Sequence, residues 1–125
     1  MSPESFKALL DATGGIPVAY YQFLNTEDDP PPPPPFVCWF ITGSEDFFAD
    51  NVNYVSICAV AVELYTAFKD FALEAKFEAA FKAAGLSYER EETDLDDQRM
   101  HMTTWTMEVL LEYAPDDGAD DNKGG

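Results

Sequence analysis

The chain has 125 residues and carries 24 acidic side chains against 7 lysines and arginines, which gives a formal net charge of −17. The length suits one domain, and a hydrophobic content of 46% is enough for a core. A surface this acidic repels phosphates, which excludes a direct grip on nucleic acid. Two options remain: a protein whose surface must repel DNA, and a protein that imitates DNA.

No apolar run approaches the roughly 20 residues of a transmembrane helix. The first residues, MSPESFKALL, lack the basic region and long apolar stretch of a signal peptide. We therefore expect the protein to stay in the cytoplasm where it is made. Cys38 and Cys58 each lie in an apolar run, and with only His101 elsewhere they make a poor metal site. We interpret both cysteines as buried thiols.

Taken in chain order, the first element is a helix that starts at Ser2-Pro3-Glu4, with a serine cap, a proline in the first turn and an acid at the positive end of the dipole. Gly14-Gly15 ends it. Residues 18–23, VAYYQF, have the aromatic composition of a strand. Acids and prolines fill residues 27–35, which predicts a connection between two strands.

Residues 36–42 predict a second strand, and Gly43 to Asp46 predict a turn or loop. Residues 52–66 predict a long central strand that is apolar on both faces and therefore covered on both sides. One face carries Val55, Ile57, Ala59 and Ala61, and the other carries Tyr54, Cys58, Val60, Val62 and Leu64.

Asp70 predicts the start of a second helix, which Gly85 ends and in which Glu78 and Lys82 are spaced to form an ion pair. Its apolar face comprises Leu73, Phe77, Ala80, Phe81 and Ala84. A strand over residues 86–93 and an acidic turn, DLDDQ, follow. Residues 100–113 alternate between apolar and polar side chains, which predicts a last strand with His101, Thr103, Trp105, Met107, Val109, Leu111 and Tyr113 on its buried face.

The predicted order α-β-β-β-α-β-β indicates an α+β domain over residues 1–113, with a mixed or antiparallel sheet of about five strands and two helices packed on one face. Residues 114–125 contain no core-forming side chain and predict an acidic, flexible tail. Two short helices cannot cover both faces of the long central strand. We therefore expect other copies of the chain to cover the second face.

The stretches ALLDATGGIPVAYYQF, FVCWFITGSEDFFADNVNY and VELYTAFKDFALEAKFEAAFKAAGLSYEREET, together with the order of elements, resemble small tail-terminator proteins of long-tailed bacteriophages and prophages, of the lambda type. The resemblance covers roughly residues 4–113 and is one of pattern, since such proteins have no catalytic signature. The six prolines and the acidic tail depart from the family.

The resemblance implies a virion protein of the tail or neck, assembled in the host cytoplasm. It implies a ring, usually of six copies, that caps the tail tube and joins it to the head connector or stopper protein. DNA passes through such a ring without specific binding. No cofactor, metal, membrane or catalytic residue is implied. An acidic channel wall agrees with this role because it repels DNA.

Two sets of site residues follow. Candidates for contact with partners or other subunits are Phe47, Phe48, Asp50, Tyr54, Pro30, Pro35 and Phe36, and candidates for an acidic channel wall are Glu91, Glu92, Asp94, Asp96 and Asp97. The proline run favours extended polyproline II of ~19 Å, a stiff arm that cannot extend a sheet edge. The plainer alternatives are a tolerated loop insertion, and phenylalanines that tuck under the end of the sheet.

Other functions fit the residues less well. Glu45, Asp46 and Asp50 lack the spacing of a calcium loop. His101 alternates inward with Trp105, as a packed strand residue does, and no phosphate loop, nucleophile elbow or zinc helix is present, so we expect no enzyme. The main alternative is an acidic inhibitor, either a DNA-mimic anti-restriction protein or an immunity protein. Another neck or head-completion protein is a further alternative.

Overall fold

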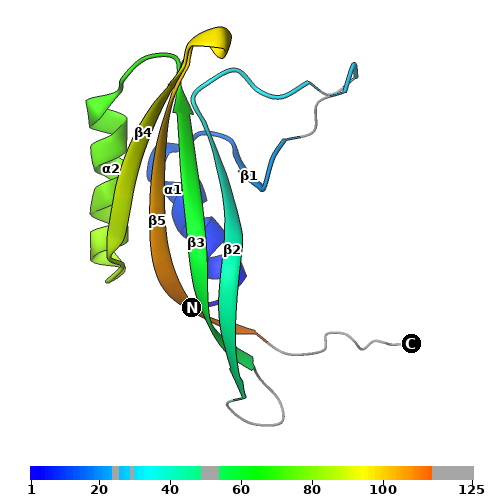
Figure 1. Ribbon diagram of the computed structural model, residues 1–125, viewed down its shortest axis with the longest axis vertical. Coiled ribbons are helices and arrows are strands. Elements are labelled where there is room, and N and C mark those ends of the chain that lie inside the picture. The colour runs from blue at the N-terminus through cyan, green and yellow to red at the C-terminus, as the bar shows by residue number, and fades with distance from the viewer. Residues whose placement is uncertain (24–25, 29, 49–53, 114–125) are drawn as a thin grey trace.

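The computed structural model describes residues 1–23, 26–28, 30–48 and 54–113 (Figure 1). The elements in chain order are α1 (Pro3–Gly14), β1 (Val18–Tyr20), β2 (Phe36–Phe48), β3 (Tyr54–Thr66), α2 (Phe71–Ala83), β4 (Tyr88–Leu95), the short 3₁₀ helix η1 (Asp96–Gln98) and β5 (Met100–Tyr113). The five strands form one mixed sheet in the order β1-β2-β3-β5-β4, in which only β1 and β2 run parallel. The predicted α+β class and order of elements are confirmed.

Both helices begin and end where their capping residues place them. The Ser2 hydroxyl accepts a hydrogen bond from the Ser5 amide at 3.0 Å, and the Asp70 carboxylate accepts one from the Leu73 amide at 3.0 Å. Gly15 and Gly85 follow the helices with positive φ angles of 65° and 77°, which glycine adopts without strain. Neither described helix has the length and apolar character needed to cross a membrane.

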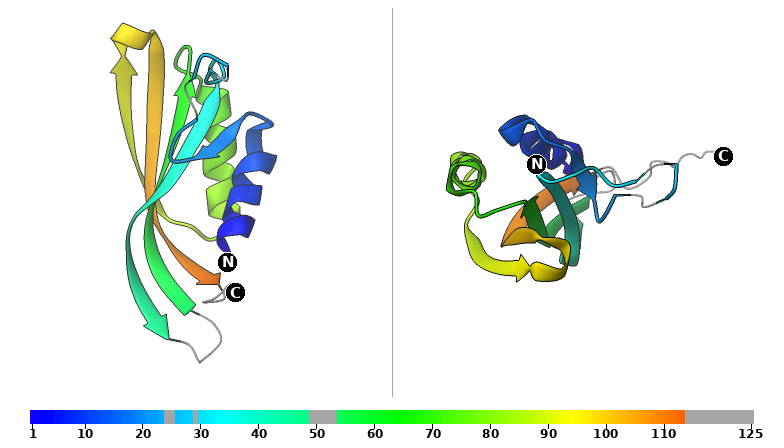
Figure 2. Two further views of the ribbon diagram at one scale, coloured as in Figure 1. Left: turned by 90° about the vertical axis from the view of Figure 1, so that its right-hand side faces the viewer. Right: turned by 90° about the horizontal axis from the view of Figure 1, so that it is seen from above.

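The helices lie side by side on the same face of the sheet, which we call the helix face (Figure 2). Phe6 and Leu10 of α1 and Phe77 and Phe81 of α2 are fully buried against the strands. Trp105 of β5 lies among them, with its ring centroid 5.8 Å from Phe77 and 5.4 Å from Phe81. Complete burial of each large side chain stabilises the fold by roughly 1.5–3 kcal/mol, so this layer holds the two helices to the sheet.

The two longest pairings place β3 at the centre of the sheet, between β2 and β5. The predicted alternation of β5 is confirmed over the described side chains, because every second residue from His101 to Leu111 is buried. The helix face of β3 is equally continuous, and its buried residues are Ser56, Cys58, Val60, Val62, Leu64 and Thr66.

Two strand predictions need correction. β1 ends at Tyr20 rather than at residue 23, because Tyr21 has a φ of 73° that turns the chain out of the strand. The expected turn at Gly43 is absent, because β2 runs on to Phe48 along its long partner β3. The register shifts between Ile41 and Gly43, so the glycine marks a β-bulge inside the strand.

Smaller differences concern α2 and β4. Ala84 is exposed, whereas Glu74, which has no place in the predicted apolar face, is buried. Glu78 pairs with Arg90 at 2.8 Å rather than with Lys82, because β4 brings a guanidinium alongside the helix. β4 spans Tyr88–Leu95, and the acidic turn after it includes η1. The predicted tail over residues 114–125 lies outside the described residues.

Candidate functional site

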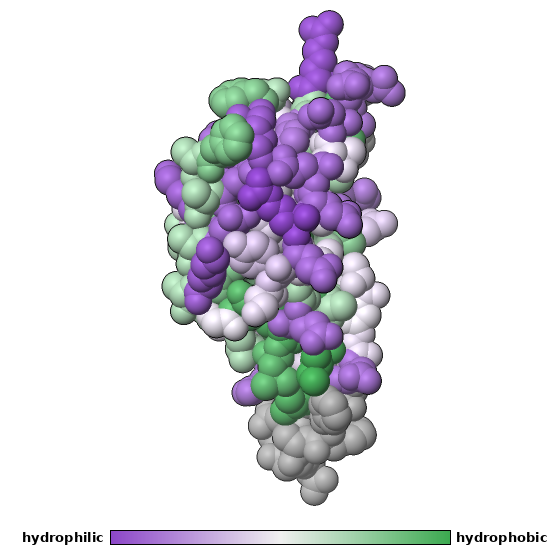
Figure 3. Space-filling view, turned by 60° about the vertical axis from the view of Figure 1, so that its left-hand side comes forward, coloured by the Kyte–Doolittle hydropathy of each residue, from purple (hydrophilic) through white to green (hydrophobic). Residues whose placement is uncertain are grey.

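The face of the sheet opposite the helices is unevenly covered. At the end away from η1, we define the open strip as the outward-facing residues of β3 and β5 there: Val55, Ile57, Ala59, Glu108, Leu110 and Glu112. Leu110 is 48% exposed and pairs with Ile57 across the two strands. In the space-filling view, hydrophobic surface gathers below the start of β4, at the end of the sheet away from η1 (Figure 3). An apolar strip flanked by carboxylates is typical of a contact surface.

The strip borders open backbone edges. β4 pairs with β5 only as far as Met107, so the later part of β5 extends beyond its neighbour. There the N-terminal residue Met1 occupies a portion of the β5 edge. The Glu112 amide donates to the Met1 carbonyl at 2.9 Å, and the Met1 amine donates to the Leu110 carbonyl at 3.3 Å. On the other side, β1 pairs only with the stretch of β2 from Val37 to Trp39. Within the described residues, three strands form this end of the sheet.

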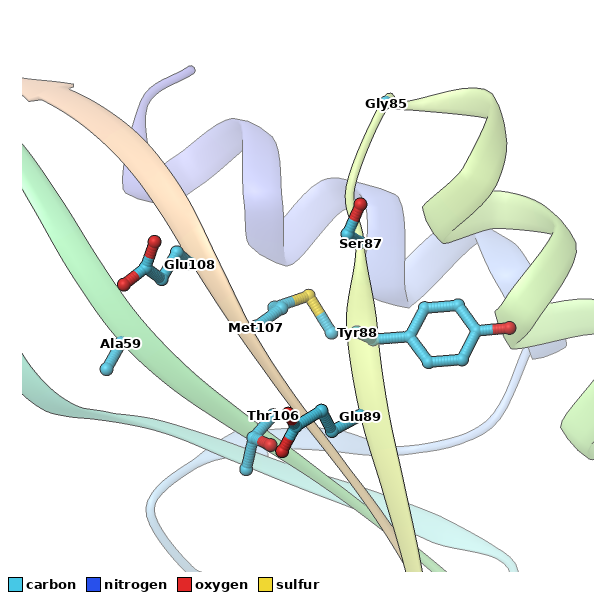
Figure 4. A pocket seen from close by; sticks show the side chains of 8 residues that line it. All are labelled: Ala59, Gly85, Ser87, Tyr88, Glu89, Thr106, Met107 and Glu108. Carbon is cyan, nitrogen blue, oxygen red and sulfur yellow. The ribbon is translucent and has the colours of Figure 1, made fainter.

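A shallow hollow of about 700 Å³ adjoins the strip where β4 begins (Figure 4). Its lining comes from three strands and the turn after α2, and comprises Ala59, Gly85, Ser87, Tyr88, Glu89, Thr106, Met107 and Glu108. Ala59 and Glu108 belong to both the hollow and the open strip. The hollow therefore extends the strip sideways across the sheet and adds the carboxylate of Glu89 to those of Glu108 and Glu112.

The structure separates the residues predicted for contacts. Phe36 and the exposed Pro30 and Pro35 lie at one end of β2, where the proline run connects β1 to β2 as expected. Phe47 and Phe48 lie at the other end, where their backbones pair with Val55 and Tyr54. The side chains of Phe47, Phe48 and Tyr54, and all of Asp50, lie outside the described residues. Their role as contacts stays a prediction.

Two of the five acids predicted for the channel wall already contact other side chains. Glu92 forms 2.7 Å ion pairs with Lys69 and Arg90, and hydrogen bonds from these two cations lower its pKa to about 2. Asp94 lies 2.8 Å from the His101 ring. Three acids form no ion pair within the described part of the chain: Glu91 on β4 and Asp96 and Asp97 in η1.

A buried charge network under β4 had no signal in the sequence. Glu74 is 2% exposed, and its carboxylate contacts Lys69 at 2.7 Å, Arg90 at 3.0 Å and the Thr103 hydroxyl at 3.0 Å. Glu78 accepts from Arg90 and from the Trp105 indole, at 2.8 Å and 3.0 Å. Tyr88 at the start of β4 meets Phe81 of α2 with 5.9 Å between ring centroids. Because the helix face of β4 is polar beyond Tyr88, these bonds hold the rest of the strand to α2 and β5.

Glu74, Glu92 and His101 place one ligand atom each within 4.8 Å of one another, a separation that suits a metal ion. Lys69 contacts both carboxylates, however, and Arg90 does so as well. Two cations thus already balance the charge that a metal would neutralise, so the geometry favours an ion-pair network.

Cys38 and Cys58 are both free and buried, as predicted. Burial, followed by the charge of Glu63, raises the pKa of the Cys38 thiol to about 11, which makes Cys38 a poor nucleophile.

No family model matches the chain, and no curated protein matches it in sequence. Six chains from solved structures match its fold. One belongs to a structure described as the virion of a native gene transfer agent particle. It is 15% identical, the match covers 85% of this chain and 83% of that one, and the TM-score is 0.45. At this level the likeness carries no functional argument.

Proposed function

We propose that this protein is a structural component of a phage-like virion that ends the tail tube as a ring of identical copies. The proposal rests on the resemblance to tail terminators, and the open strip is the observation that carries it. Ile57 and Leu110 form an apolar pair on a face that the chain's own helices do not cover. Burial of such a pair against a neighbour is favourable, whereas its exposure to water is not.

A ring needs a contact between two different surfaces, so that each copy offers one surface and receives the other. The open strip supplies the first surface, and its carboxylates Glu108 and Glu112 favour a neighbouring surface with basic side chains. Lys76 and Lys82 of α2 are exposed and meet that requirement. We propose that the strip of one copy faces the helix side of the next, and that six copies close the ring.

Glu91, Asp96 and Asp97 are the acids that we assign to the channel wall. Exposed carboxylates without cationic partners repel the phosphates of DNA and let it pass. Glu92 and Asp94 contribute less because both already contact a neighbouring side chain. The tail tube protein and the connector or stopper protein remain the proposed partners. The proposed role needs no enzymatic activity, metal or cofactor.

Negative-stain microscopy of the purified full chain, alone and mixed with polymerised tail tubes of the cognate tube protein, tests this proposal. We expect rings with a central channel, and tubes that carry one ring on one end and stop growing. Rings that bind the head connector and ignore tubes would instead indicate a head-completion protein. Globular monomers and tubes that grow unchanged would contradict the proposal.

The acidic inhibitor remains a second candidate because of one observation. Exposed glutamates stand on strands as well as in loops, and the outer face of the sheet carries Glu45, Glu89, Glu91, Glu108 and Glu112. A row of carboxylates on one face suits a DNA mimic. A monomer that blocks a restriction endonuclease on plasmid DNA would favour this candidate, and rings without such inhibition would exclude it.

A further inference from the structure

A groove of about 450 Å³ lies where the connection from β1 to β2 meets the outer face of the sheet. We propose that this groove binds one arginine side chain presented by a partner protein. The described lining consists of Tyr21, Gln22, Phe23, Pro31, Phe36, Cys38, Phe40, Glu63, Tyr65, Gln98 and Met100. The groove is at the η1 end of the sheet, so it is separate from the open strip.

Five aromatic rings line the groove. Phe36 stacks on Tyr65 with 4.8 Å between ring centroids, and Phe23 meets Phe36 edge-on at 5.5 Å. On the other side, Tyr21 meets Phe40 edge-on at 5.8 Å. Aromatic faces attract a cation within about 6 Å, and a planar guanidinium also stacks on them. Several rings around one hollow therefore suit a cationic group better than an alkyl chain alone.

A single carboxylate lies among these rings. Glu63 is half-buried and accepts one hydrogen bond, from the Tyr65 hydroxyl at 2.7 Å. Burial and this glutamate raise the pKa of Tyr65, so the tyrosine stays a neutral donor. None of the described residues that line the groove is basic. Within the described residues, no donor forms a hydrogen bond to the second Glu63 oxygen, so this oxygen can accept from a guanidinium.

The surrounding charge also selects the occupant. The sequence carries a net charge of −17, so a partner that reaches this surface gains by being basic. Pro31 forms one wall of the groove, and proline keeps that wall stiff because its backbone has little freedom to move. In this proposal the proline run forms part of a binding groove on the sheet of its own chain, and it does not act as a projecting arm. The inference does not depend on ring formation, since the lining comes from one chain.

The full chain labelled with [methyl-¹³C]methionine provides the test, because Met100 lines the groove. The probe is the blocked peptide acetyl-Gly-Arg-Gly-amide, and the matched control replaces arginine with citrulline, which is planar but uncharged. We expect the arginine peptide to shift the Met100 methyl resonance saturably and the citrulline peptide to leave it in place. Glu63→Gln keeps an acceptor for Tyr65 and should weaken binding about tenfold.

Glu91→Gln serves as the control variant, since it removes a carboxylate from the same face outside the groove, and its binding should equal that of the wild type. Phe40→Leu should also weaken binding by removing one ring. The inference is overturned if no saturable shift is seen, if citrulline binds as well as arginine, or if Glu63→Gln binds as tightly as the wild type. Ring formation by the same samples is scored separately by microscopy, so failure of one proposal does not imply failure of the other.

Discussion

The two faces of the central sheet look alike in sequence but differ in what covers them. On the helix face, Val60, Val62 and Leu64 are at most 1% exposed beneath α1 and α2. On the outer face of the same strand, Val55 and Ile57 are only half-buried and Ala59 is exposed. A strand that is apolar on both sides therefore needs two covers, and its own helices supply one.

The outer face itself divides into two regions. At the η1 end, Phe36 and Phe40 pack against Phe23 and Tyr21 of the β1–β2 connection, and Tyr65 stacks on Phe36. At the other end lies the open strip, on which the described chain places no such cover. The difference indicates a partly self-covered region, where we propose a site for one side chain, and an uncovered region, where we propose a subunit interface.

The largest expected effect comes from the helix face. Phe77→Ala should destabilise the fold by about 3–5 kcal/mol, because a fully buried ring that touches Trp105 and Phe81 is lost and a cavity remains. Urea unfolding at one fixed protein concentration measures this. Phe68→Ala, at a side chain that is 67% exposed, is the matched control and should change stability by about 0.5 kcal/mol or less. Equal losses for both variants would contradict the proposed core.

The next effect concerns the buried network. Glu74→Gln keeps the shape of the side chain but leaves Lys69 and Arg90 facing a neutral amide, which should cost about 2–4 kcal/mol. Glu91→Gln, at an exposed carboxylate on the same end of the sheet, should be nearly neutral. A Glu74→Gln variant as stable as the wild type would show that the network does not hold β4 in place.

A smaller effect depends on pH. The pKa of Glu92 lies at about 2, below its ordinary value of 4.5, because Lys69 and Arg90 donate hydrogen bonds to it. The ionised carboxylate therefore stabilises the folded state above pH 4.5, and this contribution disappears as the pH falls towards 2. Glu92→Gln should be less stable than the wild type at neutral pH, and the difference should shrink through that window. A difference that does not vary with pH would contradict the assignment.

The sequence predicted the fold well where local signals and periodicity act. Ser2, Asp70 and the glycines after each helix set boundaries through backbone hydrogen bonds, and the alternation of β5 matched its burial. Predictions failed where the structure of a segment depends on contacts with residues far away in the sequence. Gly43 signals a turn on its own, but pairing with β3 carries β2 through it as a bulge.

The candidate site was harder to predict for the same reason. Glu74 lies on a buried helix position because Arg90 and Lys69 arrive from elsewhere in the chain. The groove that we propose for an arginine side chain brings together Tyr21, Phe40 and Glu63, and their spacing in the sequence follows no recognisable pattern. The surplus of apolar strand surface was predictable, since it depends only on the alternation within β3.

The molar mass of the assembled protein tests the central proposal most directly. Size-exclusion chromatography with light scattering should give a wild-type mass that is a multiple of the 13.9 kDa chain, with six copies expected. Leu110→Ser should move the protein towards the monomer while its circular dichroism stays unchanged, and Phe68→Ser, at an exposed side chain outside the strip, should leave the assembly intact. A wild-type protein that remains at 13.9 kDa over the whole accessible concentration range would contradict the proposal that other copies cover the open strip.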